Sequence, residues 1–132
     1  MLLYGQLGAG KSVLARGIAA GLGVNEVMAS PTFTLMQPYK GKSFPVYHFD
    51  LYRLSDSDEL FAAGLDEFIG TDGIAIIEWP QQADVCPDRR IEIDIDVVDC
   101  GRLITLEAFG IDKERTDSLY AAVNELTKAQ KQ

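Results

Sequence analysis

Eight residues near the start of the chain have the types and spacing needed to hold phosphate groups. They match the pattern of a glycine, four variable residues, and then Gly-Lys-Ser or Gly-Lys-Thr. The eight are Gly5, Gln6, Leu7, Gly8, Ala9, Gly10, Lys11 and Ser12. Glycines let main-chain N–H groups turn toward phosphate oxygens, a lysine adds a mobile cation, and a serine hydroxyl can bind the Mg²⁺ that accompanies them. The motif therefore predicts a site for a nucleoside triphosphate.

The segments on either side of this motif are the elements that must position it. Residues 1–4 are apolar and predict a short strand, and residues 11–22 predict a helix with Leu14, Ile18 and Leu22 on one stripe. A helix that begins at the loop directs the positive end of its dipole at the phosphates. A glycine-rich turn that binds nothing is the alternative, and the order strand, loop, helix argues against it.

Two carboxylates are candidates to complete the site, because a phosphate cradle alone hydrolyses nothing. Residues 74–77 form a continuous apolar run, typical of a strand buried on both faces of a parallel sheet, and Glu78 follows directly. Glu78 is our candidate to hold magnesium, and an exposed acid at a strand end is the alternative. Asp50 ends another strand and could orient the attacking water or a magnesium-bound water. An Asp that caps a turn or pairs with Arg53 is an equally good interpretation.

Four other side chains could contact nucleotide but also have simpler structural interpretations. Thr32 could sense the outer phosphate, as switch segments do. For Thr34, ordinary strand propensity is the better explanation. His48 is the single histidine, and such a residue is more often a hydrogen-bonded part of the structure than a catalyst. Trp79 follows Glu78, and we expect it to pack rather than to bind nucleotide.

The periodicity of the remaining segments predicts an α/β fold, a P-loop NTPase-like three-layer sandwich with a mixed β-sheet. Residues 91–98 alternate, with isoleucines and Val97 expected inward. Their acidic positions predict the solvated face of an edge strand rather than a metal site; they are Glu92, Asp94 and Asp96. The expected strands are residues 1–4, 33–39, 44–51, 74–77, 91–98 and 103–109. The expected helices are residues 11–22, a short one capped by Ser55 or Asp56 and interrupted at Gly64, and 116–129.

Length and composition limit the possible functions. The 132 residues predict a single domain over 1–132, and the absence of a long apolar run or signal peptide predicts a cytoplasmic protein that is not in a membrane. The net charge of −8 argues against strong autonomous binding to nucleic acid. Cys86 and Cys100 lack zinc spacing and are expected to be reduced thiols. No Asn-Lys-x-Asp motif is present, which favours ATP over GTP.

Four segments together give the chain a resemblance to a known family. They are Gly5-Gln-Leu-Gly-Ala-Gly-Lys-Ser, Ser30-Pro-Thr-Phe-Thr-Leu, Tyr47-His-Phe-Asp-Leu-Tyr-Arg-Leu and Ile77-Glu-Trp-Pro. In this order they closely resemble the bacterial TsaE-type ATPases, which are needed to make threonylcarbamoyladenosine in tRNA. The resemblance covers roughly residues 1–110, and the last two segments are far more specific than the phosphate-binding motif.

The resemblance implies a weak ATPase that uses ATP and Mg²⁺ and docks on a carbamoyl-transferase subunit and its paralogue, meeting tRNA only indirectly. It implies that Lys11 and Ser12 hold phosphate and magnesium, that Glu78 is the second magnesium ligand, and that Asp50 is required for activity. It places Thr32 in a switch-like position. Gly101 and Arg102, at the last hairpin, match a position near the nucleotide.

The chain departs from the family pattern in two places. The family usually has Asp where this chain has Gln6, which changes the loop charge without removing a phosphate donor. The family also has about a helix and part of a strand before the phosphate loop, so we expect the natural beginning of the chain to be missing, which would weaken coverage of the adenine. Two other functions stay open: a small-molecule kinase, for which only Arg89 and Arg90 cluster, and a nucleotide-dependent docking module without essential hydrolysis.

Overall fold

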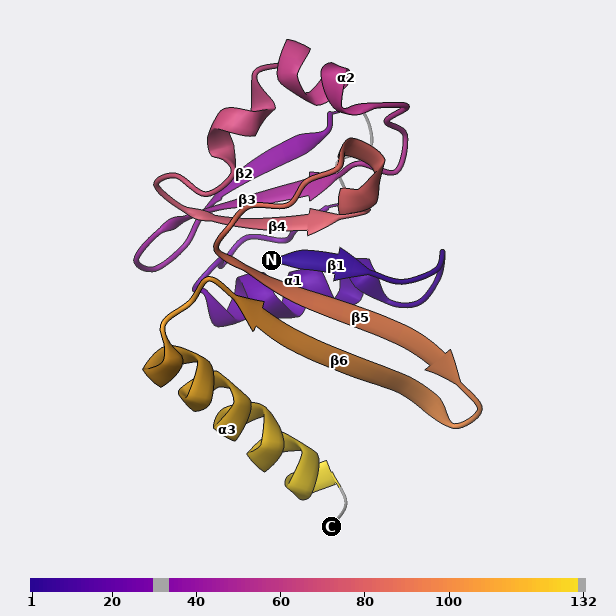
Figure 1. Cartoon of the computed structure of the whole chain (residues 1–132), viewed down its shortest axis with the longest axis vertical. Coiled ribbons are helices and arrows are strands. Elements are labelled where there is room, and N and C mark those ends of the chain that lie inside the picture. The colour runs from indigo at the N-terminus through magenta and orange to yellow at the C-terminus, as the bar shows by residue number, and fades with distance from the viewer. Residues whose placement is uncertain (30–33, 131–132) are drawn as a thin grey trace.

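The computed structural model describes residues 1–29 and 34–130 of the chain. A six-stranded sheet forms its centre, in the order β2-β3-β4-β1-β5-β6. The strands are β1 (Leu2–Tyr4), β2 (Met36–Lys40), β3 (Pro45–Asp50), β4 (Ile74–Glu78), β5 (Arg90–Val98) and β6 (Gly101–Phe109). The helices are α1 (Lys11–Gly21), α2 (Ser57–Ala62), α3 (Lys113–Gln130) and the 3-10 helices η1 (Leu65–Phe68) and η2 (Pro80–Ala83). Figure 1 shows how they are arranged.

The sheet is mixed, as the sequence predicts. Strand β1 pairs in parallel with β4 and β5, and β3 pairs in parallel with β4. The outer strands β2 and β6 run antiparallel to β3 and β5. Because β1, β3 and β4 run in the same direction, their carboxyl ends meet at one edge of the sheet. The phosphate-binding motif follows β1 at that edge (Figure 1).

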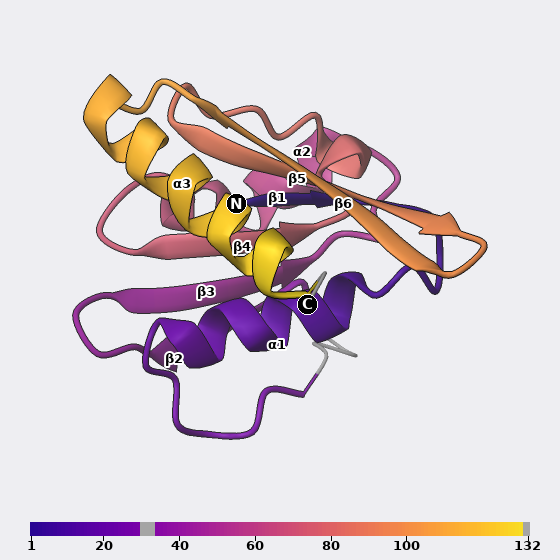
Figure 2. The same cartoon turned by 90° about the horizontal axis from the view of Figure 1, so that it is seen from below.

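Two apolar clusters fill the spaces above and below the sheet. On one face, Ala15 and Ala19 of α1 pack against Leu3, Ile76 and other strand residues. On the opposite face, Leu60 of α2 packs on the sheet residues Phe49, Ile77 and Leu2. Figure 2 shows α1 along one face and α2 behind the other. The predicted three layers are therefore present.

The first two helices begin where the sequence predicts. In α1 the buried residues are Lys11, Ala15 and Ala19. The predicted stripe of Leu14, Ile18 and Leu22 is only partly buried. Small residues let the helix lie close to the sheet. Asp56 caps α2 by accepting a hydrogen bond from the Glu59 N–H at 3.2 Å, and Gly64 ends the segment with a left-handed φ of 69°.

The last third of the chain differs from three expectations. Residues 91–98 form an inner strand, because β6 is the edge. Val97, expected inward, is exposed because it extends past the end of the layer that covers Ile93 and Ile95. Helix α3 begins three residues earlier than expected, and none of its residues 113–129 is buried. It lies beyond β6 (Figure 1). The Tyr120 hydroxyl of α3 accepts a hydrogen bond from the Ala108 N–H of β6.

Among residues 1–29 and 34–130, no helix combines the length and the apolar character needed to cross a membrane.

Candidate nucleotide-binding site

The loop between β1 and α1 has the backbone shape that the motif predicts. Gly10, which directly precedes α1, has a left-handed φ of 113° that a side chain would strain. Gly5 has a φ of 155°, and a Cβ there would lie 2.9 Å from the Ile95 carbonyl oxygen. Both positions therefore need glycine. Of the other loop residues, Gln6, Leu7 and Gly8 are exposed, whereas Ala9 is buried beneath the loop.

Lys11 is the buried cation of this loop, with 5 % of its surface exposed. Its Nζ donates hydrogen bonds to the carbonyl oxygens of Gly5 at 2.6 Å and Gln6 at 2.8 Å, and it lies 4.2 Å from the centre of the Trp79 ring. Burial lowers the pKa of Lys11, while the negative charges of Glu78 and Asp50 act in the opposite direction. The ammonium is thus held at the loop by main-chain oxygens and an aromatic face.

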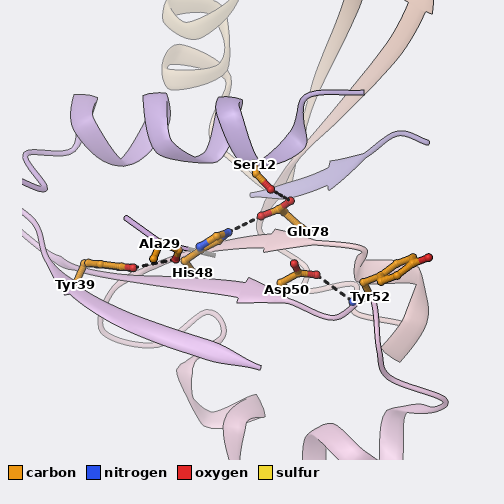
Figure 3. A network of polar contacts seen from close by, with 7 residues as sticks. All are labelled: Ser12, Ala29, Tyr39, His48, Asp50, Tyr52 and Glu78. Carbon is orange, nitrogen blue, oxygen red and sulfur yellow. Dashed lines mark hydrogen bonds and ion pairs between the residues drawn. The ribbon is translucent and has the colours of Figure 1, made fainter. Parts of the chain in front are cut away.

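Ser12 and Glu78 come together from different elements. The Ser12 hydroxyl, in the first turn of α1, donates a hydrogen bond of 2.8 Å to Oε1 of Glu78, at the end of β4. The second carboxylate oxygen, Oε2, lies 2.6 Å from Nε2 of His48 on β3. Figure 3 shows the resulting chain Ser12–Glu78–His48 between α1 and the sheet. The alternative of an exposed acid at a strand end is wrong, since Glu78 is only 2 % exposed.

Asp50 lies at the same edge of the sheet, directly across from Glu78 in the β3–β4 register. Its Oδ1 accepts a hydrogen bond of 3.1 Å from the Tyr52 main-chain N–H, a local turn-capping contact (Figure 3). The structure therefore shows the capping interaction that the sequence left open. Its side chain is also close enough to influence Lys11 electrostatically. A role in orienting water stays a prediction.

The hairpin between β5 and β6 reaches the phosphate loop through one side chain. Nε of Arg102 donates a hydrogen bond of 2.9 Å to the carbonyl oxygen of Ala9. Gly101 begins β6 and pairs with Val98. The structure thus brings Arg102 to the loop, with its bond directed at the main chain. A position of Gly101 and Arg102 near the nucleotide stays a prediction. Thr32 lies outside the described residues.

These groups fit a magnesium–triphosphate ligand. The Ser12 hydroxyl and the Glu78 carboxylate lie side by side, and both are oxygen ligands of the kind that Mg²⁺ prefers. The Lys11 ammonium lies at the same loop. Within the described ranges there is no group of three or more His, Cys, Asp or Glu side chains that could hold a metal. Mg²⁺ does not need such a group, because it is usually bound by one or two carboxylates together with waters and substrate phosphates.

Two residues of this site make contacts that the sequence did not predict. His48 is a buried, hydrogen-bonded part of the structure, as expected, but the sequence did not show that its partner is the carboxylate that faces Ser12. Trp79 packs against Tyr52, with ring centres 4.9 Å apart, as expected of a packed aromatic, but it also covers Lys11. Trp79 has a φ of 59°, which is unusual for a bulky residue. The alternation of side chains along β3 was a signal for His48, because it places His48 on the same face of the sheet as Asp50.

The mixed sheet, the phosphate-type loop and the helix that follows it define an α/β protein with a P-loop NTPase-like fold. The sequence profile described as "Threonylcarbamoyl adenosine biosynthesis protein TsaE" matches residues 1–104. The chain therefore belongs to the TsaE family.

Individual relatives agree with this assignment. The chain is 42 % identical over 107 residues to the tRNA threonylcarbamoyladenosine biosynthesis protein TsaE of Haemophilus influenzae, covering 80 % of this chain and 68 % of that protein. It is 38 % identical over 112 residues to the Bacillus subtilis protein of that name, covering 83 % and 70 %. The crystal structure of Bacillus subtilis YdiB has a similar fold, with a TM-score of 0.66, 31 % identity, and coverage of 96 % of this chain and 76 % of that one.

Proposed function

We propose that this protein is a magnesium-dependent ATPase that acts in the threonylcarbamoyladenosine modification of tRNA in the cytoplasm. The observation that carries the proposal is the 2.8 Å hydrogen bond between Ser12 and Glu78 at the mouth of the phosphate loop. Ser12 follows the loop between β1 and α1, whereas Glu78 ends β4. The fold therefore brings together, from two distant segments, two oxygen ligands of the kind that magnesium prefers. The family to which the chain belongs provides the pathway.

Each residue has a distinct task in this proposal. Main-chain N–H groups of the loop and the amino end of α1 bind the phosphate oxygens. Lys11 leaves the carbonyl oxygens of Gly5 and Gln6 and neutralises phosphate charge. Ser12 and Glu78 hold magnesium, which neutralises the charge that develops during phosphoryl transfer. Asp50, two strands from the loop and opposite Glu78, orients the water.

The partners in this proposal are a carbamoyl-transferase subunit and its paralogue, with tRNA contacted only through them. The net charge of −8 supports an indirect role at tRNA. Partners that complete the site would explain a low activity of the isolated chain, since residues supplied in trans accelerate other P-loop enzymes.

The structure offers little for a small-molecule kinase. Such an enzyme closes an arginine-rich lid over its second substrate, and Arg89 and Arg90 are the one cluster in the sequence. Arg90 is already engaged: Nε donates to Glu92 Oε1 at 2.9 Å, and the guanidinium lies 4.1 Å from the centre of the Phe109 ring. The cluster therefore contributes a single exposed arginine, Arg89.

The test measures phosphate release from ATP by the purified protein, alone and with the two partners and tRNA. Three proteins are compared: wild type, Glu78→Gln, and Glu26→Gln, in which the same change falls on an exposed glutamate. We expect slow turnover that the partners stimulate, a loss of about 100-fold in Glu78→Gln, and no change in Glu26→Gln.

Two results would contradict the proposal. Transfer of phosphate to a small acceptor would make the protein a kinase. Full formation of threonylcarbamoyladenosine by a complex containing Glu78→Gln that does not hydrolyse ATP would leave a docking module, for which hydrolysis is incidental.

A further inference from the structure

His48 is a buried polar residue whose ring has one hydrogen-bonding partner within residues 1–29 and 34–130. It is 2 % exposed, and its Nε2 lies 2.6 Å from Oε2 of Glu78. Its other ring nitrogen, Nδ1, is buried and has no hydrogen-bond partner among the described residues. A buried nitrogen without a partner costs free energy. An apolar side chain at this position would avoid the cost, so the bond to Glu78 is the feature that the imidazole provides.

The direction of this hydrogen bond follows from the chemistry of the two groups. An ionised carboxylate has no proton to donate, so Nε2–H of His48 donates and Oε2 of Glu78 accepts. The opposite oxygen, Oε1, accepts from the Ser12 hydroxyl. The carboxylate is thus fixed at both oxygens, by the sheet on one side and by α1 on the other.

The strand register explains how His48 reaches this position. In the parallel pair of β3 and β4, Asp50 is opposite Glu78, and His48 is opposite Ile76, two residues earlier on the same face. The Glu78 side chain therefore leans back along the sheet to meet His48 instead of extending past the edge into solvent (Figure 3).

A carboxylate at this edge has a competing partner in Lys11. Burial lowers the pKa of Lys11, while the negative charge of Glu78 acts in the opposite direction. Nζ nevertheless donates to the carbonyl oxygens of Gly5 and Gln6. A Glu78 carboxylate released from His48 would be free to turn toward this ammonium, which would remove it from Ser12 and occupy the cation needed for phosphate.

We propose that His48 is a positioning residue for Glu78: its Nε2–H holds Oε2 so that Oε1 stays directed at Ser12, where the magnesium ion binds. The inference rests on the proposed function, because it presumes that Ser12 and Glu78 hold magnesium. His48 is buried and, in the part of the chain that the structure describes, its ring bonds to Glu78 alone, so it acts through that residue and not on the nucleotide. Partners that orient metal ligands in this way typically change metal affinity by about 10- to 100-fold when removed.

The experiment titrates Mg²⁺ into the purified protein mixed with a fluorescent ADP analogue, and separately measures the affinity for that analogue in EDTA. His48→Leu removes the donor at similar volume. His48→Gln keeps an amide N–H that can reach Glu78. We expect the midpoint of the Mg²⁺ titration to rise at least about tenfold in His48→Leu. It should stay near the wild-type value in His48→Gln, and affinity in EDTA should be similar for all three.

The outcomes separate this inference from the proposed function. If wild-type protein shows no effect of Mg²⁺ on nucleotide affinity, the proposed function itself is wrong. If wild type responds to Mg²⁺ and His48→Leu has the same midpoint, or loses affinity equally in EDTA, the positioning role is overturned and the proposed function stands. Should His48→Leu fail to fold, His48→Asn replaces it, because its shorter amide does not reach Glu78 and the same comparison with His48→Gln decides.

Discussion

The sheet has two unlike halves. In the parallel half, formed by β1, β3 and β4, polar groups are buried: His48 and Glu78 on the strands and Lys11 at the adjoining loop. In the hairpin half, formed by β5 and β6, apolar groups are exposed: Val97, Val98, Leu103 and Ile104. In these examples, burial therefore depends on whether a helix covers that part of the sheet and not on whether the residue is polar or apolar. Helices cover both faces of the parallel half, whereas α3 lies beyond the edge strand β6 (Figure 1).

Burial falls sharply across the hairpin half itself, from β5 to β6, and two isoleucines can measure this fall. Ile95 and Ile104 are register partners on β5 and β6, yet Ile95 is 3 % exposed and Ile104 is 52 % exposed. Ile95→Ala should lower the free energy of unfolding by about 2 to 5 kcal/mol, since it leaves a cavity in the core. Ile104→Ala should cost less than about 1 kcal/mol.

Urea unfolding followed by circular dichroism gives both values, and each variant is the control for the other. Equal losses in the two variants would mean that an element or a second molecule covers β6 in solution, and the contrast between the halves would disappear.

In the parallel half, removing charge should matter most at Lys11. Lys11→Met keeps the stem but loses the ammonium, and we expect affinity for a fluorescent ATP analogue to fall about 100-fold, because charge-assisted bonds to phosphate are lost. Lys42→Met makes the same change at an exposed lysine in the β2–β3 turn and should leave affinity unchanged. Similar affinity in Lys11→Met and wild type would place nucleotide binding elsewhere.

In a chain that begins at Met1, a second amino group lies at the opposite end of β1 from Lys11. The Met1 amino group donates a hydrogen bond of 2.7 Å to the Ala75 carbonyl oxygen, and burial lowers its pKa to about 6. The pKa in the unfolded chain is near 8. Between these values the unfolded chain binds more protons than the folded one, so the free energy of unfolding should rise by about 2 kcal/mol from pH 6 to pH 8.

Urea unfolding at both pH values, of the chain with Met1 free and with Met1 acetylated, isolates this effect. The acetylated chain has no amine to titrate, so the difference between the two proteins must change with pH. A constant difference would mean that the amino group is solvated.

The smallest effect is expected where the two halves meet. Arg102 of the hairpin donates to the Ala9 carbonyl oxygen of the phosphate loop. Arg102→Ala should weaken nucleotide binding by less than about tenfold, the value of one hydrogen bond at an exposed site. Arg89→Ala, at another exposed arginine, is the control in the same binding assay. A loss as large as that of Lys11→Met would show that Arg102 contacts the nucleotide directly.

The parallel half was the more predictable from sequence. Its strands and the start of α1 contain residue patterns that are rarely found outside nucleotide-binding folds of this kind. Examples are Gly-Lys-Ser and the apolar run that ends at Glu78. The convergence of Ser12 and Glu78 follows from parallel pairing, because strands that run together end together. The bond between His48 and Glu78 did not follow, since it depends on a diagonal contact set by the register and the side-chain rotamer.

The hairpin half was predictable in pairing but not in burial. Alternation along residues 91–98 identifies the two faces, and Ile93 and Ile95 are buried as expected. Alternation does not say how far the covering layer extends, so Val97 was wrongly expected inside. For the same reason the apolar stripe of α3 did not predict its exposed position, with Leu126 open to solvent. A stripe indicates which face is available for packing, and not whether a neighbour is present.

The most direct test of the account is a crystal structure of the protein with magnesium and a non-hydrolysable ATP analogue. We predict that the triphosphate lies in the loop from Gly5 to Ser12, with the Lys11 ammonium on its outer phosphates. We also predict that magnesium is bound by the Ser12 hydroxyl, with Glu78 coordinating the ion directly or through a water. Magnesium bound away from Ser12 and Glu78, or a nucleotide bound at another surface, would contradict the account.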